Sequence, residues 1–272
     1  MSFVRFAHIS DSHIKPFGDT CLQGRDTHQS ARYAVRELNR FLRGADFVIH
    51  TGDVTADPGI EAIAPAQEIF AELLFPFRGL PGNHDSPDEI RSLMEAALAR
   101  HPDPTLRWHG AKEGRMPYVF EIRGHTFAAL DAVPEAPFWG ARLPTDQLDL
   151  VRTLIAQDVP SLTIFIHYPV VSTGVPWIDE KMLLWNGGEL HELLRRAPLG
   201  VVKGVFTGHV HHPFTSVRDG ILYSSTASTF DQFRAFPGDL EPGARSEEQP
   251  GYAIVDVTPE ETKVSHQRIL KE

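Results

Sequence analysis

Side chains that commonly bind metal ions follow short apolar segments at five places in this sequence. In residues 47–53 (FVIHTGD), a mostly apolar run leads through a glycine to Asp53. The same pattern yields seven candidate ligands in total: Asp11, His13, Asp53, Asn83, His167, His209 and His211. Short apolar runs predict buried strands, and α/β sheets hold catalytic groups at the carboxyl ends of their strands. We therefore expect these seven side chains to meet in one cleft.

The mixture of nitrogen and oxygen donors indicates which metal ions this cleft could bind. Imidazole, amide and carboxylate ligands together suit first-row transition ions better than Mg²⁺ or Ca²⁺, which prefer oxygen ligands. Two such ions about 4 Å apart need a carboxylate between them to offset their repulsion, and Asp53 is the candidate for this bridge. The sequence predicts two divalent ions per chain and leaves Mn²⁺, Fe²⁺ and Zn²⁺ open.

Two pairs of candidate ligands are separated by a single residue, in Asp11-x-His13 and His209-x-His211. Residues spaced this way lie on one side of an extended segment, so each pair is expected to reach the metals together. The chain contains 14 histidines, and an isolated histidine is usually a surface or core residue. We therefore interpret as surface or core residues the histidines that lack a candidate ligand beside them at a strand end: His28, His50, His101, His109, His125, His191, His212 and His266.

The elements that must position these ligands alternate between strands and helices in the first hundred residues. Asp26 followed by Gln29, and Ser86-Pro87 followed by Glu89, are typical helix starts. Strands are expected at 3–10, 47–53, 77–80, 118–122, 126–130, 162–167, 201–206, 214–217, 222–225, 252–257 and 262–270. Helices are expected at 26–43, 59–75, 87–100, 145–157 and 189–196. This alternation predicts a parallel sheet with antiparallel additions, and hence a mixed α/β fold.

Composition sets limits on the class of protein. A chain of 272 residues with 42% hydrophobic content can form one large domain, predicted here to span 1–272. A net charge of −10 without a basic run argues against long nucleic acids as partners. A lone cysteine excludes an intrachain disulfide, and no apolar run approaches the roughly 20 residues of a membrane helix. We expect a cytoplasmic protein with a mobile loop at about 235–250; the sequence leaves a homo-oligomer open.

Five sequence blocks resemble, in order, those of the calcineurin-like metallophosphoesterases. The blocks are Asp11-x-His13, Gly52-Asp53, Gly82-Asn83-His84-Asp85, His167 and Gly208-His209-x-His211. Within that superfamily the chain is similar to bacterial class III cyclic-nucleotide phosphodiesterases and to glycerophosphodiesterases. Trp177, Asp179, Leu184 and Asn186, in a substrate-side loop at about 168–187, are near a pattern of those enzymes, and residues 228–233 resemble another. Tyr168 is a departure, because many relatives have a histidine at its position.

The resemblance implies a four-layer α/β/β/α sandwich with mixed sheets and with two metal ions at the strand ends. One ion would take Asp11, His13, Asp53 and His211, and the other Asp53, Asn83, His167 and His209. His84 is at the position that the family uses to stabilise phosphoryl charge or to protonate a leaving group; the alternative is a hydrogen bond to a ligand. Asp85 is expected to orient a metal-bound imidazole. Substrate contacts are expected from Asn83, His84, Trp177 and Asn186.

The predicted activity is the hydrolysis of small phosphodiesters by water that two divalent ions activate. Cyclic nucleotides such as cyclic AMP are the leading substrates. Alternatives are glycerophosphodiesters, broad-specificity hydrolysis that includes monoesters, and a non-catalytic interaction module. A monoester carries nearly two negative charges and a diester one, and no Arg or Lys adjoins the five blocks to attract the second charge. Four aromatic residues could stack on a base or simply pack: Trp177, Trp185, Phe230 and Phe233.

Overall fold

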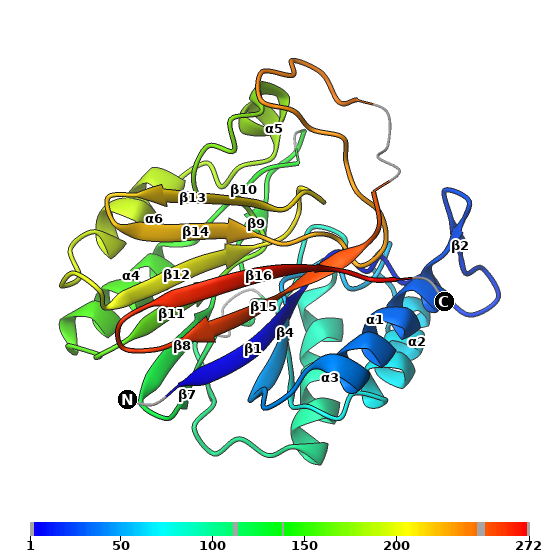
Figure 1. Ribbon diagram of the computed structural model, residues 1–272, viewed down its shortest axis with the longest axis horizontal. Coiled ribbons are helices and arrows are strands. Elements are labelled where there is room, and N and C mark those ends of the chain that lie inside the picture. The colour runs from blue at the N-terminus through cyan, green and yellow to red at the C-terminus, as the bar shows by residue number, and fades with distance from the viewer. Residues whose placement is uncertain (1–2, 111–113, 138, 244–247, 271–272) are drawn as a thin grey trace.

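The structure, a computed structural model, describes residues 3–110, 114–137, 139–243 and 248–270 of the chain. Two large β-sheets face each other at its centre (Figure 1). The five-stranded sheet has the order β16 (Thr262–Arg268), β15 (Gly251–Val257), β1 (Val4–Ile9), β4 (Phe47–His50) and β5 (Phe77–Gly79). Strands β1, β4 and β5 are parallel, while β15 and β16 add to the sheet in antiparallel fashion.

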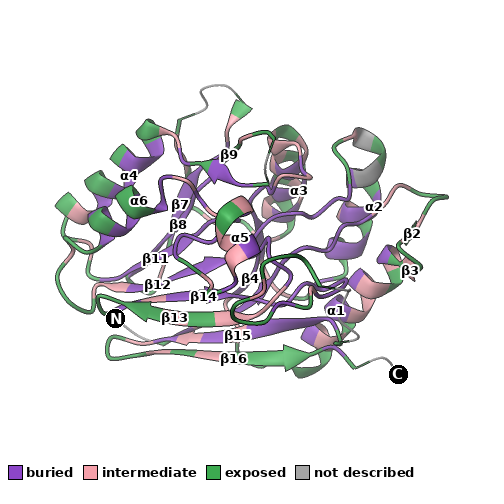
Figure 2. Ribbon diagram, turned by 90° about the horizontal axis from the view of Figure 1, so that it is seen from above, coloured by how far each residue is buried: buried purple, intermediate pink, exposed green. Residues whose placement is uncertain are grey.

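The second sheet has seven strands and is also mixed. Its order is β13 (Phe214–Arg218), β14 (Ile221–Ser225), β12 (Val202–Thr207), β11 (Leu162–Phe165), β8 (His125–Ala129), β7 (Tyr118–Ile122) and β6 (Arg107–Trp108). The central strands β8, β11, β12 and β14 are parallel, and the hairpin β7–β8 is the one that the sequence predicts. Figure 2 shows that β13 and β16, each at one edge of its sheet, are largely exposed whereas the inner strands are buried.

Phenylalanine rings fill the space between the two sheets. Phe6 and Phe47 come from the five-stranded sheet and stack on each other, with ring centroids 5.0 Å apart. Phe165 of the facing sheet meets Phe6 edge-on at 5.4 Å, and Phe120 meets Phe47 edge-on at 5.2 Å. All four rings are fully buried. Aromatic pairs of this kind contribute about 0.5–1.5 kcal/mol each beyond their burial, so they fix how the sheets face each other.

Helices cover the outer faces of the sheets and complete the four layers. Helices α1 (Thr27–Phe41), α2 (Ile60–Ala71) and α3 (Pro87–Arg100) lie on one side of the strands, and α4 (Thr145–Ala156) and α6 (Gly187–Leu194) on the other (Figure 1). The apolar faces of α1 and α3 join the core around the five-stranded sheet, and those of α4 and α6 join the core of the seven-stranded sheet. The predicted α/β/β/α sandwich is therefore confirmed.

The two predicted helix starts differ in detail. At α1, Asp26 caps the helix as expected, because its carboxylate accepts a hydrogen bond from the backbone N–H of Gln29 at 2.8 Å. At α3, Ser86 occupies the N-cap position without a side-chain capping bond. Glu89 accepts instead from the backbone N–H of Gly59 at 3.2 Å, which ties the starts of α2 and α3 together. No helix in the described ranges is both long and apolar enough to cross a membrane.

Several short elements were not predicted. Between the strand expected at 3–10 and the helix expected at 26–43 lies the hairpin β2 (Cys21–Leu22) and β3 (Arg25–Asp26). Farther along the chain, β9 (Val133–Pro134) pairs with β10 (Ala141–Arg142). The substrate-side loop expected at about 168–187 contains α5 (Pro176–Lys181). The loop expected at about 235–250 lies partly outside the described residues. In its described part, the carbonyl of Asp239 accepts from the backbone N–H of Trp177 at 3.4 Å, so this part packs on α5.

Candidate metal centre

The seven predicted ligands lie just beyond the carboxyl ends of five strands of the two facing sheets. Strands β1, β4 and β5 lead to Asp11, His13, Asp53 and Asn83. Strands β11 and β12 lead to His167, His209 and His211. Because the sheets pack face to face, both sets of strand ends open at the same edge of the sandwich. Asn83 is half-buried, and the other six side chains are buried.

Five of these residues adopt a left-handed backbone, which is uncommon outside glycine. The φ angles are 55° for Asp11, 45° for His13, 55° for Asp53, 69° for His209 and 43° for His211. The expectation that Asp11-x-His13 and His209-x-His211 are extended segments is therefore wrong. Each left-handed residue costs on the order of 1–3 kcal/mol, and such strain persists where the surrounding structure enforces it, typically at functional sites.

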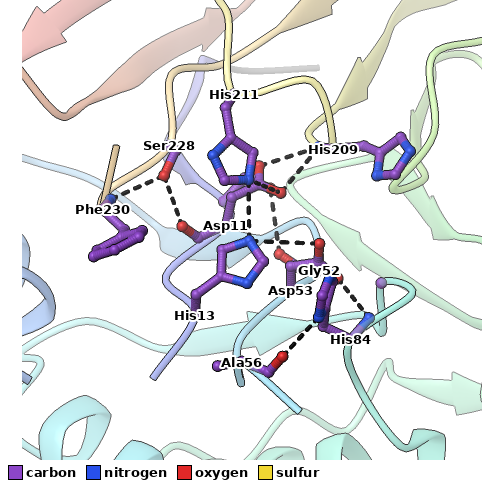
Figure 3. A network of polar contacts seen from close by, with 12 residues as sticks. Asp11, His13, Gly52, Asp53, Ala56, His84, His209, His211, Ser228 and Phe230 are labelled. Atoms are coloured by element: carbon purple, nitrogen blue, oxygen red, sulfur yellow. Dashed lines mark hydrogen bonds and ion pairs between the residues drawn. The ribbon is translucent and has the colours of Figure 1, made fainter. Parts of the chain in front are cut away.

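The first group consists of Asp11, His13 and His211. Their ligand atoms all lie within 4.8 Å of one another. The Nε2 atoms of His13 and His211 are 3.0 Å apart, and Nε2 of His211 is 3.5 Å from a carboxylate oxygen of Asp11 (Figure 3). Two ring nitrogens that face each other so closely must share a proton or face a common cation.

The second group consists of Asp53, His167 and His209, again within 4.8 Å. Nε2 of His167 lies 3.3 Å from Oδ2 of Asp53 and 3.1 Å from Nδ1 of His209. Asn83 also borders the cavity at this site, and its Oδ1 atom is buried without a hydrogen-bond partner among the described residues. A buried amide oxygen without a partner is costly, and a metal ion would satisfy it.

Asp53 stands between the two groups. Its Oδ2 atom, which faces His167, is also 3.7 Å from Nε2 of His13, while its Oδ1 atom accepts from the backbone N–H of His84 at 2.9 Å. One carboxylate oxygen thus faces a histidine of each group, as the predicted bridge requires. The structure brings all seven predicted ligands together, and their geometry and unsatisfied donor atoms fit a pair of divalent transition ions.

The carboxylates and imidazoles of the cluster shift one another's pKa values, because they are buried close together. Burial alone would raise the pKa of Asp53, but His167 and His13 hold that pKa well below its usual value. Burial alone would lower the pKa of His167, but Asp53 and Asp11 raise it to about 9. Burial lowers the pKa of His209, and neighbouring His167 acts in the same direction. Asp53 is therefore anionic beside a protonated His167, while His209 is neutral, and a bound divalent cation would take the place of the His167 proton.

His84 lies beside the bridge and borders the cavity. Its Nδ1 atom is 2.6 Å from the backbone carbonyl of Ala56, which can only accept, so Nδ1 carries the proton (Figure 3). Its ring centroid is 4.9 Å from that of His13, and His84 forms a third possible ligand group with His13 and Asp53. Nε2 is therefore the atom of His84 that remains for a substrate oxygen or for a metal.

Asp85 does not orient an imidazole, contrary to the sequence prediction. Its carboxylate accepts from the backbone N–H groups of Thr55 at 2.8 Å, Gly82 at 3.0 Å and Val54 at 3.1 Å. Burial and the charge of Asp53 raise its pKa to about 6. Asp85 thus holds the loop after Asp53 against the loop that presents Asn83.

Two motif glycines are required by close approach. A Cβ atom on Gly82 would lie 2.1 Å from Oδ1 of Asp53 and 2.5 Å from its backbone nitrogen. A Cβ atom on Gly208 would lie 1.9 Å from Oγ of Ser10 and 2.8 Å from the carboxylate of Asp11. Gly82 therefore lets two ligand loops of the five-stranded sheet pack directly against each other, and Gly208 lets a loop of the seven-stranded sheet approach the Asp11 loop.

A cavity of about 330 Å³, whose remaining wall is largely apolar, is bordered by five of the seven ligands: His13, Asp53, Asn83, His209 and His211. Apolar and aromatic residues form this wall: Leu22, Ala56, Trp139, Trp177, Met182, Phe230, Phe233 and Pro242. The acidic residues on it are Asp53, Asp57 and Asp231, and the part of the lining that the structure describes contains no lysine or arginine. The cavity can therefore accept an apolar or aromatic group beside the metal centre.

The residues expected to contact substrate separate into two sets. Asn83, His84 and Trp177 line the cavity, and the buried Trp177 ring packs edge-on against Phe233 at 5.8 Å. Asn186 does not line it: its side-chain amide exchanges two 2.9 Å hydrogen bonds with the backbone of Leu143. Trp185 is also absent from the lining and packs against Gly140.

Sequence reasoning missed several lining residues, of which Trp139 and Asp231 have the most chemical interest. Trp139 is 54% exposed at the cavity, and Asp231 is buried beside His211. Trp139 lies in a connection without a regular pattern. Asp231 is inside the stretch 228–233 that resembles the class III enzymes, but no local signal marks it as a partner of His211.

The structure combines a face-to-face α/β/β/α sandwich with two adjacent groups of histidine and carboxylate side chains at the strand ends. This combination defines a class of dinuclear metallohydrolases. A family model described as Calcineurin-like phosphoesterase matches residues 4–213. The chain therefore belongs to the calcineurin-like phosphoesterase family.

The individual relatives have low sequence identity to this chain but match most of its length. The 3',5'-cyclic adenosine monophosphate phosphodiesterase CpdA of Pseudomonas aeruginosa is 28% identical, over 89% of this chain and 84% of the relative. An Arcobacter nitrofigilis protein named "Probable glycerophosphodiester phosphodiesterase GpdQ" is 25% identical, over 95% of this chain and 90% of its own. Among solved structures, a dimetal phosphatase from Danio rerio superimposes with a TM-score of 0.65 at 15% identity, covering 96% of this chain and 98% of that one. This last similarity supports the fold alone.

Proposed function

We propose that this protein is a metal-dependent phosphodiesterase that hydrolyses small phosphodiesters, with 3',5'-cyclic nucleotides such as cyclic AMP favoured. The proposal depends chiefly on Asp53, a single oxygen of which faces both ligand groups beside a cavity lined by aromatic residues. The similarity to the CpdA protein over most of both chains supports the choice of substrate.

In this proposal the seven ligands hold two divalent ions. One set is Asp11, His13, Asp53 and His211, and the other is Asp53, Asn83, His167 and His209. When bound, two such ions activate water for attack on phosphorus and neutralise charge on the phosphoryl oxygens. Manganese, iron and zinc all suit this donor set.

The chain's own contribution to the reaction beyond the ligands is His84. The hydrogen bond from Nδ1 of His84 to the carbonyl of Ala56 fixes the orientation of the imidazole ring, and therefore also the direction in which Nε2 points. With both ring nitrogens protonated, Nε2 of His84 would donate a hydrogen bond to a phosphoryl oxygen or give its proton to the leaving alkoxide. Trp177, Phe230 and Phe233 would contact the organic part of the substrate, where stacking of a base is worth about 1–3 kcal/mol.

The charge of the cavity favours diesters over monoesters. A monoester brings nearly one more negative charge than a diester at neutral pH, and the described lining has three acidic residues and no lysine or arginine to bind it. A second phosphate group, as in a nucleoside diphosphate, would likewise find no basic partner. The leaving group is therefore expected to be uncharged and partly apolar.

A panel of substrates tests the proposal. The metal-reconstituted protein is assayed for kcat/KM on cyclic AMP, glycerophosphoethanolamine and a nucleoside diphosphate. Cyclic AMP is expected to be hydrolysed most efficiently. Higher efficiency on glycerophosphoethanolamine would favour the alternative, a glycerophosphodiesterase, which the similarity to the GpdQ-named protein supports. Hydrolysis of none of the three would overturn the proposal.

The remaining sequence predictions stay predictions. They are a single domain over residues 1–272, a cytoplasmic location, a mobile loop at about 235–250 and the capacity to form a homo-oligomer.

A further inference from the structure

The histidines that face Asp11 and Asp53 have different groups behind their rings. Nδ1 of His167 is 2.7 Å from the backbone carbonyl of Thr51. Nδ1 of His211 is 3.0 Å from a carboxylate oxygen of Asp231 and 3.1 Å from the Asp231 carbonyl. These oxygens accept, so each Nδ1 donates and each Nε2 is left for a metal. One ring is thus supported by a neutral carbonyl, and the other by a carboxylate as well.

Asp231 is held firmly in this position. Its side chain is 2% exposed, and its backbone N–H donates to Oγ of Ser228 at 3.1 Å. The Ser228 hydroxyl in turn donates to the backbone carbonyl of Asp11 at 2.7 Å, which joins this loop to the first ligand loop (Figure 3). The geometry does not depend on an exposed, mobile side chain.

The His211 ring is clamped from a second direction. Phe233 stacks on it with ring centroids 4.7 Å apart and an angle of 19° between the planes. The backbone N–H of Phe233 also donates to the carbonyl of His211 at 3.0 Å. The imidazole therefore has a fixed plane, and the Asp231 carboxylate fixes which nitrogen keeps its proton.

A carboxylate behind a ligand imidazole makes that imidazole a stronger donor than a carbonyl does, because its negative charge stabilises the ring as electron density moves to the metal. Removal of such a partner lowers metal affinity roughly 10–100-fold. Only the first of the two ligand groups, Asp11, His13 and His211, has this arrangement in the part of the chain that the structure describes.

We propose that Asp231 is a positioning residue that makes the Asp11, His13 and His211 subsite the tighter of the two metal sites. The inference rests on the metal centre of the proposed function but not on the identity of its substrate. It predicts that the two ions bind with separate affinities and that Asp231 sets the difference between them.

Calorimetric titration of the chelated, metal-free protein with Mn²⁺ alone tests this. The wild type is expected to bind two ions in resolved steps. Asp231→Asn keeps the shape and an acceptor but removes the charge, and it is expected to weaken the tighter step roughly 10–100-fold while the weaker step is unchanged. Asp231→Ala, which removes the acceptor as well, is expected to weaken the same step at least as much.

The control is Asp131→Asn, which removes a second buried carboxylate that pairs with Arg115 and does not line the cavity. This variant is expected to bind both ions as the wild type does. Unchanged binding in a folded Asp231→Asn or Asp231→Ala protein overturns the inference, as does equal weakening of both steps. If the wild type fails to bind two ions, the proposed function itself is wrong, and this outcome is distinguishable from the others.

Discussion

Nε2 of His167 lies 3.3 Å from Oδ2 of Asp53. The same oxygen is 3.7 Å from Nε2 of His13, a residue of the other ligand group. Removing the Asp53 carboxylate should therefore empty both metal sites rather than one. We expect Asp53→Ala to retain less than one ion per chain after reconstitution with Mn²⁺, where the wild type retains two.

Metal analysis of the dialysed proteins measures this. Asp57→Ala is the matched control, because Asp57 also lines the cavity but is largely exposed and belongs to none of the ligand groups. Equal metal content in wild type and Asp53→Ala would refute the bridge.

His84 should act on the substrate rather than hold metal. His84→Ala is expected to keep both ions and to lose roughly 10²–10⁴-fold in kcat, the usual effect of removing a general acid or a charge-stabilising donor. Steady-state kinetics and metal analysis of the same preparation measure both quantities. His101→Ala, a change near the end of α3, serves as control. Loss of an ion from His84→Ala would show that His84 is a ligand, as its group with His13 and Asp53 allows.

Gly82 tests how closely the two ligand loops must approach. A methyl group at this position would meet both the carboxylate oxygen Oδ1 and the backbone nitrogen of Asp53, so rotation of the Asp53 side chain alone cannot make room and the residue must shift. Gly82→Ala is expected to lower metal affinity by at least tenfold. Gly188→Ala is the control, since a Cβ there meets nothing within 4 Å. Wild-type Mn²⁺ affinity in Gly82→Ala would mean that the loops can separate without cost.

Acid should destabilise the metal-free fold through His8. Burial lowers the pKa of His8 to about 3, and the charges of His266 and His50 act in the same direction. The pKa in the unfolded chain is higher, so the stability contributed by neutral His8 is present above about pH 6.5 and is lost as pH falls toward 3. Between pH 7 and 5 the loss is about 2 kcal/mol.

Urea unfolding of chelated protein at these two pH values measures the slope, and chelation removes any contribution from metal release. His8→Gln keeps a polar partner for the Thr51 hydroxyl, which lies 2.9 Å from Nε2 of His8, but does not titrate. Its free energy of unfolding is expected to fall less than that of the wild type over this range. Identical slopes would contradict the account.

The strands and the seven candidate ligands were accessible from the sequence because both depend on local patterns. An apolar run predicts a buried strand by itself, and a polar residue directly after it must lie at the strand end. The sheet pairing of β1, β4 and β5 then brings Asp11, Asp53 and Asn83 together without any further information.

The features of the site that the sequence did not predict depend on contacts between segments that are distant in the chain. The left-handed backbone of Asp11 and His209 arises where loops from opposite sheets meet, so the spacing i, i+2 wrongly indicated an extended chain. Asn186 matched a motif, yet its amide is used by Leu143, 43 residues away in the chain. Asp231 reaches His211 across 20 residues with no periodic signal between them.

The most direct test of the account is the metal dependence of diester hydrolysis. The measurement is kcat/KM for bis-(p-nitrophenyl) phosphate and for p-nitrophenyl phosphate, with chelated protein and with protein reconstituted with Mn²⁺, Fe²⁺ or Zn²⁺. The account predicts no activity after chelation, recovery with at least one of these ions, and higher efficiency on the diester. Activity that survives complete chelation, or a higher kcat/KM on the monoester, would contradict it.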